Sequence, residues 1–168
     1  MIPEVYNEIQ DLKNEIKQLK QQLMEKQLNE FSLKVDKSEF KKQRISNQME
    51  AADYIRQFYS DDIEIYESSF ILLLNRANDT IGYAKISQGG ITGTVIDTKI
   101  VLKYCIDSLA SAFILCHNHP SGSLKPSKED IQITKRIKEA SKLIECDLLD
   151  HIILTTEGYY SMMEGGEL

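Results

Sequence analysis

The stretch that decides the fold covers residues 112–130 and has the sequence AFILCHNHPSGSLKPSKED. It opens with an unbroken apolar run over residues 112–116, which is typical of a central strand buried on both faces. His117 and His119 follow directly. Because alternate residues of an extended chain point the same way, the two imidazoles can converge just beyond this strand. Pro120 then ends the strand, since it has no N–H to donate.

A helix expected over residues 128–145 presents a carboxylate to the same place. Its apolar stripe consists of Ile133, Ile137, Ala140 and Ile144. Asp130 lies three residues before Ile133 and therefore falls on this core-facing stripe. A carboxylate there is costly unless it is paired or bound to a cation. Two imidazoles and one carboxylate leave a fourth tetrahedral position for water, which is the arrangement of catalytic zinc.

A simpler interpretation of this helix start is a capping box, with Ser127 as the N-cap and Asp130 as the third helical residue. Taken alone, such caps are common, and two histidines taken alone are ambiguous. Their combination in one strand–loop–helix unit favours the metal site. The two interpretations are compatible, because Ser127 can cap the helix and still present its hydroxyl to the site.

A hydrolytic zinc site also needs a proton carrier. Zinc lowers the pKa of bound water to around 7, and a neighbouring carboxylate can take the proton and return it. Four acidic residues precede a strand expected over residues 70–74, namely Asp61, Asp62, Glu64 and Glu67. Nothing local distinguishes one of them, and acidic residues before a strand are usually only solvated.

The remaining pattern alternates strands and helices, which predicts an α/β fold with a sheet covered by helices. Further strands are expected over residues 31–35, 80–87, 148–155 and 159–162. Further helices are expected over residues 47–59, capped by Ser46, and over residues 98–109, capped by Asp97. We therefore divide the chain into an N-terminal heptad helix, a linking strand and helix, and a metal-site domain, over residues 1–29, 30–62 and 63–168.

The N-terminal helix has heptad order over residues 2–27. Position a holds Ile2, Ile9, Ile16 and Leu23, and position d holds Val5, Leu12 and Leu19. Isoleucine at a with leucine at d favours a parallel two-stranded coiled coil. Glu8 and Glu15 at position g would face Lys13 and Lys20 at position e of the partner. We expect a homodimer, although the helix is short and its stripe could instead pack on its own domain.

Bulk composition argues against several classes of protein. The chain has 168 residues and a net charge of -6. Non-specific binding to DNA depends on positive side chains that release counterions from the phosphates, so an acidic chain is not expected to bind DNA by default. No apolar run approaches the ~20 residues that span a bilayer, and no secretory signal opens the sequence. We expect a cytoplasmic protein with no membrane contact. The sequence has three cysteines that lie far apart, namely Cys105, Cys116 and Cys146. An odd number with this spacing favours buried free thiols over disulfides.

The complete motif resembles that of the JAMM (MPN+) metallopeptidases. Their signature is His-x-His-Pro followed, after six residues, by Ser-x-x-Asp. Here it is met without substitution by His117, His119, Pro120, Ser127 and Asp130. The longer string HNHPSG, the downstream pair Asp150-His151 and the later pair Tyr160-Ser161 resemble the bacterial RadC family. This similarity runs from about residue 64 to the C-terminus and more weakly from residue 31.

The resemblance implies a cytidine-deaminase-like fold of three layers around a mixed sheet. It implies one Zn²⁺ per chain, held by His117, His119 and Asp130, and hydrolysis of a peptide or isopeptide bond. It further implies that Glu67 acts as general base and acid, because the family's catalytic glutamate opens the corresponding strand over residues 67–75.

The resemblance also bears on two further residues. Ser127 matches the serine that hydrogen-bonds the oxyanion in related enzymes. Asp150 and His151 match a family motif whose role is unclear, and His151 could orient a metal ligand or be a satisfied core histidine.

Two departures from the family pattern weaken a role in DNA repair. RadC-like proteins commonly carry an N-terminal helix-hairpin-helix module, where this chain has the heptad helix. They often have Pro-Arg-Glu before the middle helix, where this chain has Asp97-Thr98-Lys99. Three hypotheses follow, namely a zinc metallopeptidase, a DNA-associated accessory module that binds without cleaving, and a coiled-coil scaffold with an inert domain.

Overall fold

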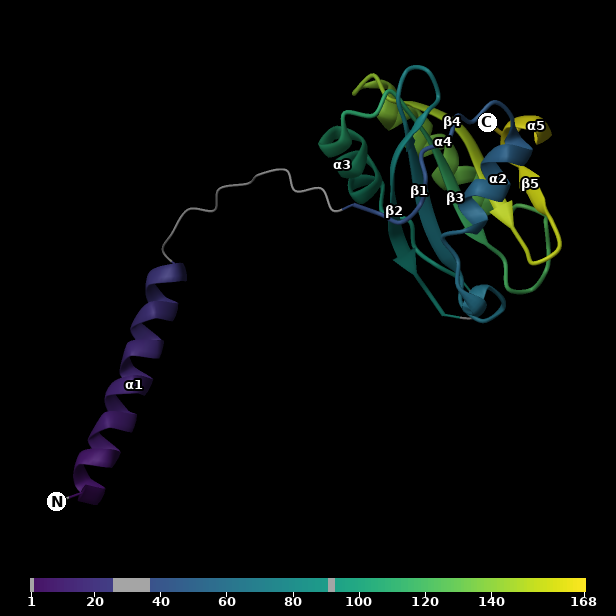
Figure 1. Ribbon diagram of the computed structural model, residues 1–168. Coiled ribbons are helices and arrows are strands. Elements are labelled where there is room, and N and C mark those ends of the chain that lie inside the picture. The colour runs from purple at the N-terminus through teal and green to yellow at the C-terminus, as the bar shows by residue number, and fades with distance from the viewer. Residues whose placement is uncertain (1, 26–36, 91–92) are drawn as a thin grey trace. The chain divides into compact units, whose positions relative to one another are not determined.

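The computed structural model describes residues 2–25, 37–90 and 93–168. The chain divides into two compact units, Met1–Lys37 and Ser38–Leu168. Helix α1 (Ile2–Glu25) belongs to the first unit, and the other elements labelled in Figure 1 belong to the second. The strand expected over residues 31–35 lies outside the described residues.

A five-stranded mixed sheet forms the centre of the second unit, with strand order β2-β1-β3-β4-β5 (Figure 1). Its strands are β1 (Ser68–Leu74), β2 (Thr80–Gln88), β3 (Ala112–Asn118), β4 (Asp147–Leu154) and β5 (Tyr159–Ser161). Strand β3 is antiparallel to β1 and parallel to β4. Every residue of β3 is buried, as the unbroken apolar run predicts.

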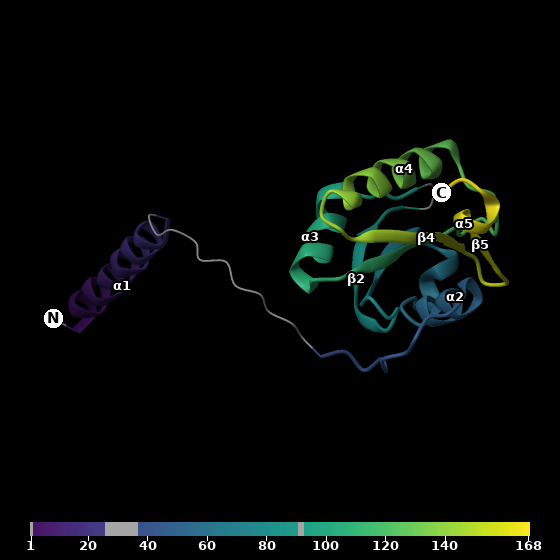
Figure 2. The ribbon, with the colours of Figure 1, turned by 90° about the horizontal axis from the view of Figure 1, so that it is seen from above.

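Helices cover both faces of this sheet, so the expectation of an α/β fold is confirmed. Helix α2 (Gln48–Arg56) lies on one face, and α3 (Thr98–Ser108) and α4 (Lys128–Lys142) lie on the other (Figure 2). In β3, Ile114 and Cys116 belong to the core with α2, while Phe113 and Leu115 belong to the core with α3 and α4. By this alternation, His117 points to the α3–α4 face.

The start of helix α2 and the end of helix α4 differ from the predicted boundaries. The N-cap of α2 is Asn47, whose side chain accepts the N–H of Glu50, so the prediction of Ser46 as the cap is wrong. Ser46 instead donates its backbone N–H to the Glu50 carboxylate. Helix α4 ends at Lys142, because the following residues turn through Glu145, which has a positive φ of 53°.

The C-terminal end of the chain also departs from expectation. Strand β5 ends at Ser161, whose side chain caps the short helix α5 (Met162–Gly165) by accepting the N–H of Glu164. A 3-10 turn, η1 (Asp61–Glu64), precedes β1. The cap predicted at Asp97 is confirmed at the start of α3. The three cysteines are free and buried, as predicted.

Helix α1 presents to solvent, in this single chain, those heptad side chains that the structure describes. Val5, Ile9, Leu12, Ile16 and Leu19 are each 44–53% exposed. Among the helices that the structure describes, none combines the length and apolar character needed to cross a membrane. Pairing of α1 with a second copy stays a prediction.

Candidate metal centre

The histidines predicted to converge lie at the end of β3. His117 is within the strand, and His119 follows one residue after the strand ends. The His119 N–H donates to the Leu154 carbonyl at 2.9 Å, so the chain continues extended beside β4. Asn118 points to the other face, where its amide donates to the carbonyls of Ile63 and Tyr66.

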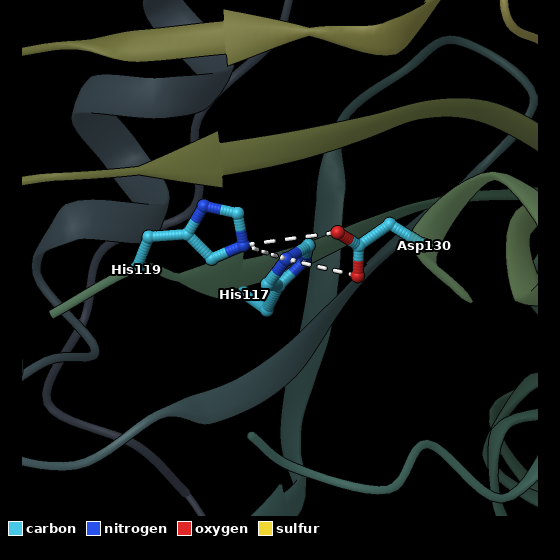
Figure 3. Close-up of side chains that lie close together, drawn as sticks. All are labelled: His117, His119 and Asp130. Atoms are coloured by element: carbon cyan, nitrogen blue, oxygen red, sulfur yellow. Dashed lines mark hydrogen bonds and ion pairs between the residues drawn. The ribbon is translucent and has the colours of Figure 1, made fainter. Parts of the chain in front are cut away.

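The structure brings His117, His119 and Asp130 together, as Figure 3 shows. The two Nε2 atoms are 3.0 Å apart. His117 Nε2 lies 3.3 Å from Asp130 Oδ1, and His119 Nε2 lies 3.7 Å from Asp130 Oδ2. Two atoms that each bind a tetrahedral zinc ion at about 2.0–2.1 Å are about 3.3–3.4 Å apart. These three side chains therefore fit a single zinc ion.

The carboxylate of Asp130 is held by the start of α4. Its Oδ2 accepts the backbone N–H and the hydroxyl of Ser127, each at 2.7 Å, and the Asp130 N–H donates back to Ser127 Oγ. The capping box predicted from the sequence is thus present. It occupies Oδ2 and leaves Oδ1 directed at His117, so capping and ligation are compatible in one side chain.

Charge in the site favours a cation. Burial raises the pKa of the Asp130 carboxyl, but the neighbouring imidazoles of His117 and His119 lower it more, and the pKa lies well below its ordinary range. The interaction with the Asp130 carboxylate is the main cause that raises the pKa of His119. The carboxylate is therefore ionised at neutral pH and calls for a positive partner, either a proton on an imidazole or a metal ion.

Glu67 lies next to this site without joining the three-residue cluster. It is half-buried and directly precedes β1. Strand alternation places it on the same side as Ser69, whose cross-strand partner is His117. Its Oε1 accepts the N–H of Thr94 at 3.2 Å, and its negative charge contributes to the raised pKa of His119. Among the acidic candidates, this contact distinguishes Glu67 from Glu64, which is exposed.

His151 lies on β4 and is fully buried. Its Nε2 is 2.8 Å from His117 Nδ1, on the side of the His117 ring that faces away from the cluster. Sequence reasoning left the place of His151 open, and it missed Thr134, whose Oγ1 contacts the other nitrogen of His151. The position of Thr134, four residues after Asp130 on the same helix, was the available signal.

A pocket of about 280 Å³ opens beside His119. It is lined by η1, by the loop after β3 and by the β4–β5 turn, through Ile63, Glu64, His119, Pro120, Ser121, Gly122, Thr155, Thr156 and Glu157. Such a hollow next to the cluster gives a substrate room to approach.

The fold and the cluster define a class of protein, namely α/β domains with a His-His-Asp cluster that could hold a metal ion at the end of the central strand. Residues 45–167 match the family described as the RadC-like JAB domain, and the chain belongs to this family.

Similar proteins carry the name UPF0758. One from Flavobacterium johnsoniae is 46% identical over 101 residues, which cover 60% of this chain and 44% of that protein. One from Porphyromonas gingivalis is 40% identical over 103 residues, covering 61% and 45%. One from Staphylococcus carnosus is 39% identical over 126 residues, covering 74% and 54%. The chain thus spans about half the length of the curated relatives it matches.

Proposed function

We propose that this chain is a zinc-dependent metallopeptidase or isopeptidase, with His117, His119 and Asp130 as the ligands of one Zn²⁺. The observation that carries the proposal is the convergence of three ligand residues. The two Nε2 atoms lie 3.0 Å apart, and each lies 3.3–3.7 Å from an oxygen of the Asp130 carboxylate. Membership in the RadC-like JAB family agrees with it, because that family fits the broader JAMM group.

In the proposed reaction, the bound zinc ion, Glu67 and Ser127 have separate roles. Bound zinc would supply a Lewis acid that polarises the scissile carbonyl and acidifies water. Glu67 takes the proton of the attacking water and returns it to the leaving amine, while Thr94 N–H holds one of its oxygens. Ser127 donates its hydroxyl to the carbonyl oxygen as charge develops there. In the present structure that hydroxyl donates to Asp130, so it must turn when substrate binds.

Two finer features belong to the same proposal. We propose that the layers follow the cytidine-deaminase-like arrangement, which helices on both faces of the sheet support. We also propose a parallel homodimer through α1, which the exposed heptad side chains support.

Hydrolysis in ¹⁸O-labelled water tests the proposed reaction. The zinc-loaded chain is incubated with a peptide library and with lysine-branched isopeptides, and products are analysed by mass spectrometry. We expect one ¹⁸O in each new carboxylate, no product after chelation, and recovery when zinc is restored. Product that persists with Asp130→Ala would contradict the proposal. Zinc-loaded protein that cleaves neither library but retains DNA at moderate salt would favour the accessory module.

A further inference from the structure

A chain of buried hydrogen bonds joins two of the three cluster residues behind the site. Thr134 Oγ1 lies 2.6 Å from the backbone carbonyl oxygen of Asp130 and 2.5 Å from His151 Nδ1. His151 Nε2 lies 2.8 Å from His117 Nδ1. Thr134 and His151 have no exposed surface, and His117 has 1%. The chain runs from α4 through β4 to β3, and each end is a residue of the cluster.

The direction of these hydrogen bonds follows from the backbone carbonyl of Asp130, which can only accept. The Thr134 hydroxyl therefore donates to that carbonyl, a bond that threonine commonly makes to the fourth preceding residue of a helix. The Met162 thioether at 3.6 Å is a weaker acceptor. His151 Nδ1 could accept this hydrogen only in its other tautomer, and the 2.6 Å contact between the two oxygens of Thr134 and Asp130 would then have no hydrogen between them. With its hydrogen used, the hydroxyl accepts from His151, so Nδ1 of His151 carries a hydrogen.

The hydrogen on His151 in turn decides which ring nitrogen of His117 carries a hydrogen. The ring nitrogens of His151 are bonded to a hydroxyl and to another imidazole, and an imidazolium buried without a carboxylate partner is costly. A neutral His151 carries one ring hydrogen, so its Nε2 accepts from His117 Nδ1–H. His117 Nε2 is then free of hydrogen, and it is the atom that faces His119 and Asp130.

We propose that Thr134 and His151 are positioning residues that fix the tautomer and the ring orientation of His117 for metal binding. This rests on the proposed function, because it takes His117 as a zinc ligand. His119 is fixed separately, since its Nδ1 donates to the Ser123 carbonyl at 2.7 Å. With both Nδ1 atoms donating to their partners, two Nε2 lone pairs and an ionised carboxylate face one point, and a cation there relieves their repulsion.

We call the hydrogen-bond chain from the Asp130 carbonyl through Thr134 and His151 to His117 the relay. Thr134→Val tests the relay, because valine keeps the shape of threonine and removes the hydroxyl. Thr134→Ser is the matched control, since it keeps the hydroxyl. Two measurements are made on the full chain. Histidine ¹⁵N NMR of the metal-free protein gives the tautomer of His117, and competition with a chromophoric chelator gives the zinc dissociation constant.

We expect wild type and Thr134→Ser to show His117 with hydrogen on Nδ1 and to bind zinc alike. In Thr134→Val, the form with hydrogen on Nε2 should become populated, and zinc affinity should fall about 10–100-fold. A wild-type His117 with hydrogen on Nε2 overturns the relay without any variant. So does a Thr134→Val protein with unchanged tautomer and affinity.

The two measurements separate failure of the relay from failure of the proposed function. Wild type that binds no zinc refutes the proposed function, while the tautomer in the metal-free protein still decides the relay. If wild type binds zinc but Thr134→Val binds it equally tightly, the relay is refuted and the proposed function stands.

Discussion

At the scale of single residues, the site depends on side chains that serve two partners at once. Asp130 uses Oδ2 to cap α4 and directs Oδ1 at His117. His119 uses Nδ1 to bond the Ser123 carbonyl and directs Nε2 at the cluster. In each case the second contact holds the side chain in the orientation that the proposed metal ion would need, so the candidate ligands are oriented by the protein itself.

Replacing Glu67 by glutamine should separate metal binding from catalysis. Glutamine keeps the size and the acceptor oxygen that bonds Thr94 N–H, but it cannot take a proton. We expect Glu67→Gln to keep the zinc of the wild type and to lose about 10²–10⁴-fold in hydrolysis rate. Metal analysis and the ¹⁸O assay measure the two effects. Loss of zinc in this variant would show that Glu67 belongs to the ligand set.

The buried carboxyl of Asp150 should give the protein a pH-dependent stability unrelated to the metal. Burial raises its pKa, although the Ser161 hydroxyl and the Met163 N–H donate to it. A raised pKa in the folded state means that the stabilising contribution of this group is present below its unfolded pKa of about 3.9 and is lost as pH rises through the folded value.

Asp150→Asn removes this titration. We expect wild type to lose stability relative to the variant as pH rises from about 3 to 7. Urea unfolding at several pH values gives the difference in free energy of unfolding. A difference that stays constant, or that moves in favour of wild type, would show that the carboxyl is not held above its ordinary pKa.

At the scale of elements, β3 and the start of α4 could be predicted because their signals are local. The apolar run of β3 indicates burial on both faces, and Ser127 with Asp130 indicates a cap. The residues that α4 buries were predicted less accurately than the position of its N-cap. Thr134, Ile137 and Ser141 are buried, whereas the predicted stripe held Ile133 in place of Thr134.

The reason for this difference lies in long-range contacts. Thr134 is buried because His151 arrives from β4 and bonds its hydroxyl, and no local pattern shows which strand will lie there. A similar limit applies to the cap of α2. Ser46 and Asn47 can both cap a helix, and the choice depends on which residue takes the extended backbone conformation that Asn47 has, with φ of -155°. The proximity of Glu67 to the histidines likewise required the sheet register, and its role stays a prediction.

The heptad pattern of α1 makes a prediction about charge. In a parallel dimer, Glu15 of one copy faces Lys20 of the other, so Glu15→Lys should weaken the dimer by placing like charges opposite each other. Adding Lys20→Glu should restore it, because the pairing is then only reversed. Asn14→Lys, outside the seam, is the control for added charge. Sedimentation equilibrium gives the dissociation constants, and a monomeric wild type would refute the dimer.

At the scale of the whole molecule, the candidate metal centre lies within one compact unit. Ser38–Leu168 contains the cluster together with Thr134, His151 and Glu67, and the family match over residues 45–167 falls inside it. α1 belongs to the other unit. The proposed chemistry therefore needs only the second unit, and α1 is free to serve association.

Zinc content of the purified chain tests the central claim most directly. Wild type and Asp130→Ala are loaded with zinc, dialysed against metal-free buffer and analysed by mass spectrometry of the element, with protein quantified by amino-acid analysis. We expect about one zinc ion per wild-type chain and a sharp fall in the variant, because a tetrahedral site that loses one of three protein ligands binds zinc weakly. Wild type that retains no zinc, or Asp130→Ala that retains as much as wild type, would contradict the account.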